Sequence, residues 1–447
     1  MSEPIDILFS TAKMSAAFSS EAHVQGMLSF EAALAHAEAQ VGIMPLEAAN
    51  AIAACCKVEL FDVAALYREA VNAGTPAIPL VRMLTAQVKS DAQRFVHWGA
   101  TSQDAIDTAL MLLMRDGLAL LIADIQDTCA SCAALAEQHR HTLMIGRTLL
   151  QQALPITFGL KAARWLALAT RQLSALRERT RQSLAVQLGG AAGTLASLGN
   201  DGLPVVELLA KELDLPVPDL PWHTERDRIA EIASTLGIVA GAMAKIAQDI
   251  ALLAQTEVAE VSEGAVAGKG GSSAMPQKRK PVDATAALAS ARLAVGMVPV
   301  VLAAMTQEHE RAVGGWQAEW VAIPQLFCTT ACAVEHVRIA IAGLQVDAAH
   351  MSANLALTKG LVMAESLTMA LATHIGRPAA YRIVQDACNR VISSGVSLQQ
   401  IAAEEYQITT ILSHAEIAQA LDPAHYLGST NLFIDRALAT YSALKES

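Results

Sequence analysis

An apolar repeat between residues 226 and 261 restricts the fold more than any other feature of the sequence. Its apolar positions follow one another at intervals of 3, 4, 3, 4, 3, 4 and 3 residues: Ile229, Ile232, Leu236, Val239, Met243, Ile246, Ile250 and Leu253. Such a repeat forms one side of a long helix that packs along its whole length in a bundle. Alanine and glycine fill many of the other positions, so a second helix can approach closely. Because one chain's bundle supplies too few partners for such a helix, we also expect a homo-oligomer.

Four further long stretches are almost free of glycine and proline, and aromatic residues make up only 4% of the chain. We therefore predict an all-α protein with a long central bundle of five helices. The four stretches are 108–140, 156–188, 282–307 and 325–357.

Shorter helical patterns flank this bundle. Before it, we predict helices at 20–41, 46–57 and 80–90, with a turn or extended segment at 73–79 because Pro76 and Pro79 disfavour helix before them. After residue 360 the helical patterns are short. The chain thus divides into an N-terminal helical domain (1–107), a central long-helix domain (108–359) and a small C-terminal helical domain (360–447).

Composition excludes several classes of protein. The net charge of −11 over 447 residues argues against a general nucleic-acid binder. No uninterrupted apolar run reaches the ~18 residues that span a bilayer, and no signal-peptide pattern opens the chain. The seven scattered cysteines fit free thiols in a reducing cytoplasm. The pair Cys129 and Cys132 lies in an apolar helical run without a second pair, which favours packed thiols over a zinc or redox site.

The stretch 263–283 is the strongest candidate for a functional loop. Its glycines disfavour helix, and the four cations Lys269, Lys278, Arg279 and Lys280 face no acid between Gly264 and Val282. In an acidic chain this is a local positive island. Composition alone leaves two interpretations equally open: a lid that closes over an anionic ligand, or a solvated linker.

Three other stretches next to long helices, 97–104, 146–159 and 222–228, carry small hydroxyl or glycine residues together with charge, and a further candidate is the charged stretch 307–311. Long helices bring distant segments together only at their ends. We therefore expect such segments, from different helices or different subunits, to meet in one site.

Three motifs resemble a known family. The run Gly271-Ser272-Ser273-Ala274-Met275-Pro276-Gln277-Lys278 is similar to the signature loop of the fumarase/aspartase superfamily, and the segments 101–104 (TSQD) and 146–151 (GRTLLQ) resemble its other two conserved regions, in the same order. The resemblance implies a three-domain all-α fold, a homotetramer whose active sites are each shared by three subunits, a small carboxylate substrate, and no metal or organic cofactor.

The resemblance also implies roles for individual residues. Family members abstract the proton α to a carboxylate, and the resulting aci-carboxylate requires positive charge and hydrogen-bond donors. Ser272 matches the catalytic base, Lys278 the family lysine, and Arg311 a carboxylate clamp. His97 matches an active-site histidine, although a packed core histidine is an equal alternative. The positions that match carboxylate-binding residues are Thr101, Ser102, Thr148, Gln151, Ser273 and Met275; for Thr101, Ser102 and Thr148 the alternative is helix capping.

One departure from the family pattern indicates the class of reaction. Many members have a histidine that protonates the leaving group at the position of Leu149, and leucine cannot donate a proton. A carboxylate leaving group needs no proton, since the pKa of its acid is only ~4. An internal carboxylate that adds to or leaves a double bond is lactone chemistry. The opening segment 8–19 and the run 153–163 also resemble those of the lactone-forming cycloisomerases of the superfamily. Lys280, where the loop usually has Asn, either serves an extra substrate carboxylate or is a solvated lysine.

Two alternatives remain open. One is membership of the adenylosuccinate lyases, although Gly74–Pro79 replaces the paired histidines that those enzymes usually carry before the first conserved region. The other is a catalytically silent structural member of the superfamily, against which the intact Ser272 and Lys278 argue.

Overall fold

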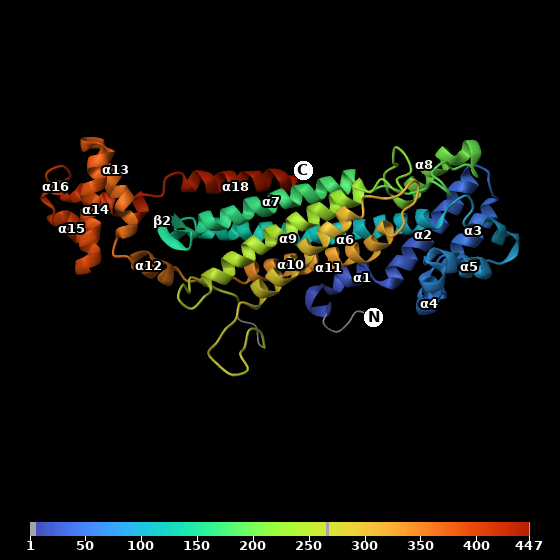
Figure 1. Ribbon diagram of the computed structural model, residues 1–447, viewed down its shortest axis with the longest axis horizontal. Helices are drawn as coiled ribbons and strands as arrows, with labels where there is room; N and C mark the ends of the chain where they lie inside the picture. The colour runs from blue at the N-terminus through green and yellow to red at the C-terminus, as the bar shows by residue number, and fades with distance from the viewer. Residues whose placement is uncertain (1–5, 265–267, 447) are drawn as a thin grey trace. The chain divides into compact units, whose positions relative to one another are not determined.

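The computed structural model describes residues 6–264 and 268–446, which are largely helical (Figure 1). Its strands form two short antiparallel pairs. β1 (Leu143–Thr148) pairs with β2 (Gln151–Thr157), and β3 (Val261–Ser262) pairs with β4 (Gln345–Val346). The predicted all-α class is therefore confirmed.

Five long helices match the five predicted long stretches: α6 (Ser102–Gln138), α7 (Phe158–Gln182), α9 (Asp227–Leu253), α10 (Val282–Ala303) and α11 (Gly315–Ala342). The last stretch was predicted too late in the chain and too long. Gly343 follows α11 directly, and the side chain of Asp347 caps a separate helix, α12 (Ala348–Ala356), by accepting a hydrogen bond from the N–H of His350.

The chain divides into two compact units, each described here by itself. Unit 1 comprises the described residues of Met1–Asp124, Gln172–Ala244 and Ala286–Glu335, and unit 2 those of Ile125–Arg171, Lys245–Thr285 and His336–Ser447. Each of the five long helices contributes residues to both units. The three sequential domains remain a prediction.

The shorter helices belong to one unit each. Unit 1 contains α1 (Ala12–Ala17), α2 (Ser20–Gln40), α3 (Leu46–Cys55), α4 (Val63–Ala73), α5 (Ala77–Gln87) and α8 (Gly202–Leu213). Unit 2 contains α12, α13 (Ala364–Ile375), α14 (Arg377–Ser394), α15 (Leu398–Glu404), α16 (Tyr406–Thr409), α17 (His414–Ala420) and α18 (Thr430–Glu446).

The apolar repeat of α9 is buried as predicted. All eight of its positions, from Ile229 to Leu253, lie in the core. On a second face, a Cβ at Gly237 would lie 2.6 Å from Val298 Cγ2 of α10, so glycine permits the close approach of these two helices in unit 1. Gly241 has no such neighbour within 4 Å.

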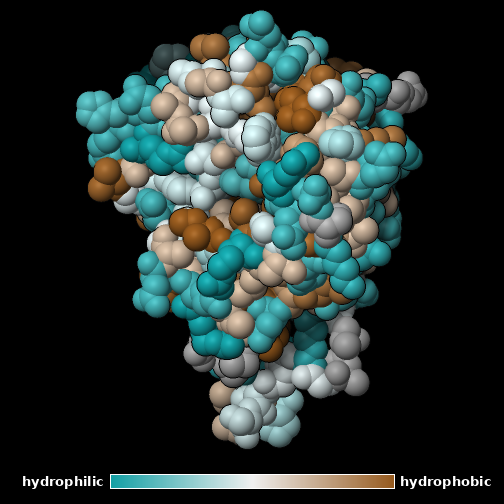
Figure 2. All heavy atoms as spheres, turned by 90° about the vertical axis from the view of Figure 1, so that its right-hand side faces the viewer, coloured by the Kyte–Doolittle hydropathy of each residue, from teal (hydrophilic) through white to brown (hydrophobic). Residues whose placement is uncertain are grey.

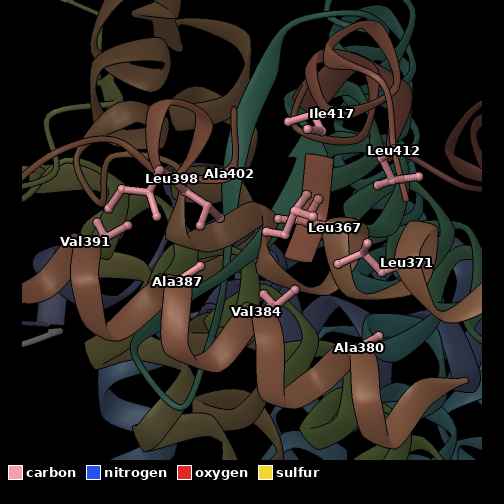
Figure 3. Packing of buried hydrophobic residues seen from close by; sticks show 12 residues of the cluster. Leu367, Leu371, Ala380, Val384, Ala387, Val391, Leu398, Ala402, Leu412 and Ile417 are labelled. Atoms are coloured by element: carbon pink, nitrogen blue, oxygen red, sulfur yellow. The ribbon is translucent and has the colours of Figure 1, made fainter. Parts of the chain in front are cut away.

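In unit 2 the C-terminal helices enclose their own apolar cluster, in which side chains from α13, α14, α15 and α17 point toward one another (Figure 3). Leu367, Leu371, Leu398 and Ile417 are almost fully buried in it. The short helical patterns after residue 360 thus form a packed group.

The prediction for 73–79 was partly wrong. Gly74 ends α4 with a positive φ of 74°, as a turn requires, but α5 already begins at Ala77. Pro79 therefore lies in the first turn of α5. The N–H groups of a first turn have no partner within the helix, so proline loses nothing there.

Within the described residues, two helices are long and apolar enough, by length and composition, to cross a membrane: α9 and α10. The sequence contains no uninterrupted apolar run of this length, but the scattered charges do not lower the mean hydropathy of these two helices enough to exclude them by composition. In the most apolar stretch of each helix, 50% of the residues of α9 but only 28% of those of α10 are buried. α10 therefore presents apolar side chains that the described residues of this chain leave uncovered.

The surface formed by α3, α5 and α8 is more mixed in polarity than the uncovered side of α10. Figure 2 shows small hydrophobic groups scattered among hydrophilic side chains on it. Such mixing is ordinary for a solvent-facing surface.

Candidate active site

The stretch from His97 to Asp104 forms a tight turn that leads into α6. His97 and Gly99 have positive φ angles of 58° and 71°. A Cβ on Gly99 would lie 2.6 Å from Leu198 Cδ2, so both the backbone angle and the space require glycine. Non-glycine residues with positive φ are uncommon and cluster at functional sites, which draws attention to His97.

Asp104 ties this turn to a second one at 189–190. Its carboxylate accepts hydrogen bonds from the N–H groups of Thr101 at 2.9 Å, Gly189 at 2.9 Å and Gly190 at 3.0 Å. His223 Nε2 lies 2.7 Å from Asp104 Oδ1. Asp104, the third residue of α6, thus caps the helix by accepting from the N–H of Thr101, and the Thr101 hydroxyl stays available for another partner.

That partner is Arg311. Its Nη1 donates to Thr101 Oγ1 at 3.1 Å, and its Nη2 donates to the carbonyl of Ala191 at 2.9 Å. Among the residues that the structure describes, no carboxylate pairs with Arg311. Its charge is therefore not neutralised, and the guanidinium can bind an anionic ligand. Ser102, which follows Thr101 and begins α6, is the next hydroxyl residue in the chain.

A buried ion-pair network supports this cluster from within unit 1. Arg226 Nη1 lies 2.7 Å from Asp107 Oδ2, and Nη2 lies 2.5 Å from Glu319 Oε2. Trp316 Nε1 donates to Asp107 Oδ1 at 2.9 Å. Burial lowers the pKa of Arg226, but the two carboxylates outweigh it and raise the pKa overall. A buried charge that loses its partner costs about 3–5 kcal/mol, so the network fixes these helix ends firmly.

In unit 2, Thr148 and Gln151 lie opposite each other at the tip of the β1–β2 hairpin. The sequence did not predict these strands. Leu149 and Leu150 form the two-residue turn with φ angles of 50° and 62°, as in a type I′ turn, which normally contains Asn and Gly. Leu149 is 97% exposed. The tip thus presents two polar side chains and a strained, exposed apolar pair.

Arg147, next to this tip, has a structural partner. Its guanidinium makes a bidentate pair with Glu260 at 2.9 and 2.7 Å. The amide of Asn354 donates to the same carboxylate at 2.9 Å. Since Glu260 is fully buried, this pair anchors β1 beside β3, and Arg147 is not available to a substrate.

The glycine-rich loop is anchored at both ends within unit 2. The Glu263 carboxylate accepts hydrogen bonds from the N–H groups of Asp283 and Ala284 and so caps α10. Asp283 also pairs with Lys269 and with His336 Nδ1. Burial raises the pKa of Asp283, but these two partners lower it further, so the net shift is downward. Residues 265–267 of the predicted loop lie outside the described residues.

Ser272 lies half-buried in this loop, and two backbone N–H groups point at its hydroxyl. Its Oγ accepts from the N–H of Met275 at 3.1 Å and of Ala274 at 3.3 Å. Donors so placed stabilise negative charge on oxygen and favour the alkoxide that a serine base requires. Ser273, Met275 and Lys278 are exposed, and Lys278 has no ion-pair partner in the described part of the chain.

Comparisons with known proteins identify the family. Residues 8–296 match a family model described as lyase, and residues 360–437 match one described as adenylosuccinate lyase C-terminus. The chain is 48% identical to the 3-carboxy-cis,cis-muconate cycloisomerase of Pseudomonas aeruginosa, over 98% of this chain and 96% of that protein. It belongs to the fumarase/aspartase superfamily of lyases.

Further comparisons place the chain among the 3-carboxy-cis,cis-muconate cycloisomerases of that superfamily. The enzyme of this name from Bradyrhizobium diazoefficiens is 49% identical over 96% of both chains. The crystal structure of the 3-carboxy-cis,cis-muconate lactonizing enzyme from Pseudomonas putida superposes with a TM-score of 0.94, at 41% identity, over 99% of both chains.

The structure collects the predicted superfamily residues into two groups. Unit 1 brings together His97, Thr101, Ser102 and Arg311 around the turn that Asp104 holds. Unit 2 contains the hairpin tip with Thr148 and Gln151, and the loop with Ser272, Ser273, Met275 and Lys278. No hydrogen bond between described residues joins the hairpin tip to the loop.

Sequence reasoning overlooked several residues that organise these groups, above all Glu31. Its carboxylate oxygen Oε1 lies 2.6 Å from His97 Nδ1. The signal was an acid within the apolar face of a helix, between Leu28 and Leu34. Glu260 and Glu263 offered no such signal. Within the described residues, no group of three or more His, Cys, Asp or Glu side chains is placed to hold a metal ion.

Proposed function

We propose that this protein is a 3-carboxy-cis,cis-muconate cycloisomerase, which interconverts that tricarboxylate and a carboxymuconolactone in the breakdown of protocatechuate. The observation that carries the proposal is Leu149 at the hairpin tip, between Thr148 and Gln151. An aliphatic side chain there supplies no proton to a leaving group, and a carboxylate needs none. The near full-length similarity to enzymes of this name supports the same reaction.

The residues have distinct roles in the proposed reaction. In the lactone-forming direction, one substrate carboxylate adds to the diene, so a carbon–oxygen bond forms and a π bond breaks. The negative charge moves into a neighbouring carboxylate as an aci-carboxylate. Ser272 Oγ–H then returns a proton to the adjacent carbon; in reverse, the alkoxide removes it. Lys278 and Arg311 balance the charge, while the substrate carboxylates are held by Thr101, Ser102, Thr148, Gln151, Ser273 and Met275.

We further propose a cytoplasmic homotetramer whose active sites combine residues of different subunits, with no metal or organic cofactor. The exposed apolar side chains of α10 and the exposed hairpin tip support it, because both need a covering partner. Such an assembly offers one way to unite the two groups of residues. Lys280 remains a candidate for the third substrate carboxylate.

A direct assay tests the function. The purified protein is mixed with 3-carboxy-cis,cis-muconate, and we expect loss of the diene's ultraviolet absorbance. Activity on adenylosuccinate alone would support an adenylosuccinate lyase instead, a possibility favoured by the description of the C-terminal match. No turnover of either substrate or of other fumarate-forming substrates would support a silent structural member.

A further inference from the structure

His97 is held in a defined orientation by a buried acid on α2. Glu31 Oε1 lies 2.6 Å from His97 Nδ1, and the side chains are 1% and 15% exposed. The two residues are 66 positions apart in the chain, so packing of α2 against the turn creates the contact. The pairing occupies Nδ1. Among the described residues, no protein group forms a hydrogen bond with Nε2, which is therefore the ring nitrogen left for a ligand.

The buried carboxylate of Glu31 lowers the stability of the fold. Glu31 Oε2 has no hydrogen-bond partner among the described residues, nor has either carboxyl oxygen of Glu38, seven residues further along the same face of α2. Buried polar groups without partners destabilise a fold by about 1–3 kcal/mol each. An apolar side chain would pack here at lower cost, so a purely structural role gives no reason for Glu31.

We infer that Glu31 is a positioning residue that holds His97 as an imidazolium and leaves its Nε2–H to a carboxylate of the substrate. The inference rests on the proposed function. The proposed substrate carries three carboxylates, and position 149, where the superfamily resemblance led us to expect a histidine, is leucine. A cationic His97, on the turn whose Thr101 accepts a hydrogen bond from Arg311, adds a second positive charge to this group of residues.

The charged groups around His97 favour its protonated form. Burial lowers the pKa of His97, but the charges of Glu31 from α2 and Asp104 from α6 outweigh it, so the pKa is raised. Glu38 faces Glu31 on α2, and burial together with the charge of Glu31 raises its pKa to about 9. The pKa of Cys56, at the end of α3, is raised chiefly by burial and also by the charge of Glu31. Glu31 and Asp104 thus raise the pKa of His97, while burial and Glu31 keep Glu38 protonated at neutral pH.

This difference between Glu31 and Glu38 provides a matched pair of variants. Glu31→Gln keeps an acceptor oxygen for Nδ1–H but removes the charge. Glu38→Gln replaces a protonated carboxyl on the same helix by an amide of the same shape. A structural role predicts similar effects for both variants, whereas a charge role singles out Glu31.

The test combines a pH profile with NMR titration of histidine ¹³Cε1–H signals in the whole protein, His97 being assigned by its loss in His97→Gln. In the wild type we expect His97 to titrate above the ordinary histidine range. Glu31→Gln should move that titration to lower pH and reduce kcat/KM about tenfold at pH 8 with little change at pH 6, as expected for loss of a charged partner. Glu38→Gln should leave both readouts as in the wild type.

Two results would overturn the inference. One is a wild-type His97 that titrates at or below the ordinary histidine value, which decides the matter even if Glu31→Gln does not fold. The other is a Glu31→Gln variant that loses activity equally at every pH with the His97 titration unchanged. Because the titration uses the resting protein, it remains informative if the cycloisomerase assay fails.

Discussion

At the scale of single residues, Ser272 is the group on which the proposed chemistry depends. Two N–H groups reach its hydroxyl oxygen at 3.1 and 3.3 Å, which favours the alkoxide. We predict that Ser272→Ala lowers kcat by roughly a thousandfold or more, since it removes the group proposed to carry the proton. Ser273→Ala, one position away, is the control and should chiefly raise KM. Steady-state kinetics and gel filtration check both; near-normal turnover of Ser272→Ala with an intact oligomer would mean that another residue is the base.

Leu149 tests the identity of the leaving group at the same scale. If a carboxylate departs, a proton donor at this position has nothing to protonate. Leu149→His should therefore leave kcat unchanged or lower it, measured by loss of diene absorbance. Leu150→His is a matched control in the same turn, where both φ angles are positive. A marked gain in kcat for Leu149→His alone would contradict the carboxylate leaving group.

At the scale of elements, the N-terminus of α10 should respond to pH through Asp283. Its pKa is lowered in the folded protein, so its contacts stabilise the fold above the ordinary carboxyl pKa. This stability is lost as the pH falls through the lowered folded value. We predict that Asp283→Asn lowers the thermal midpoint at pH 7, and that the difference from the wild type shrinks in acid. A difference that is constant with pH would assign the effect to packing.

Elements also show what the sequence can and cannot predict. The repeat in α9 was recognisable because one side of a helix obeys local periodicity. The β1–β2 hairpin was not, because Leu149 and Leu150 occupy a turn that favours Asn and Gly. The motif still identified Thr148 and Gln151 as candidates. Glu31 escaped notice since its partner, His97, lies 66 residues away, and no local pattern records such a contact.

At the scale of the whole molecule, the two groups of candidate residues raise the question of which subunit supplies each. If one site takes His97 from one subunit and Ser272 from another, two inactive variants complement each other. We predict that mixing His97→Gln and Ser272→Ala subunits, after dissociation and reassociation, restores up to about a quarter of wild-type activity, because one site in four receives both intact residues. Mixing Ser272→Ala with Lys278→Met, two changes in the same loop, is the control and should give recovery only if those two side chains come from different subunits. If the first mixture stays inactive although mass spectrometry shows mixed oligomers, His97 and Ser272 serve each site from a single chain.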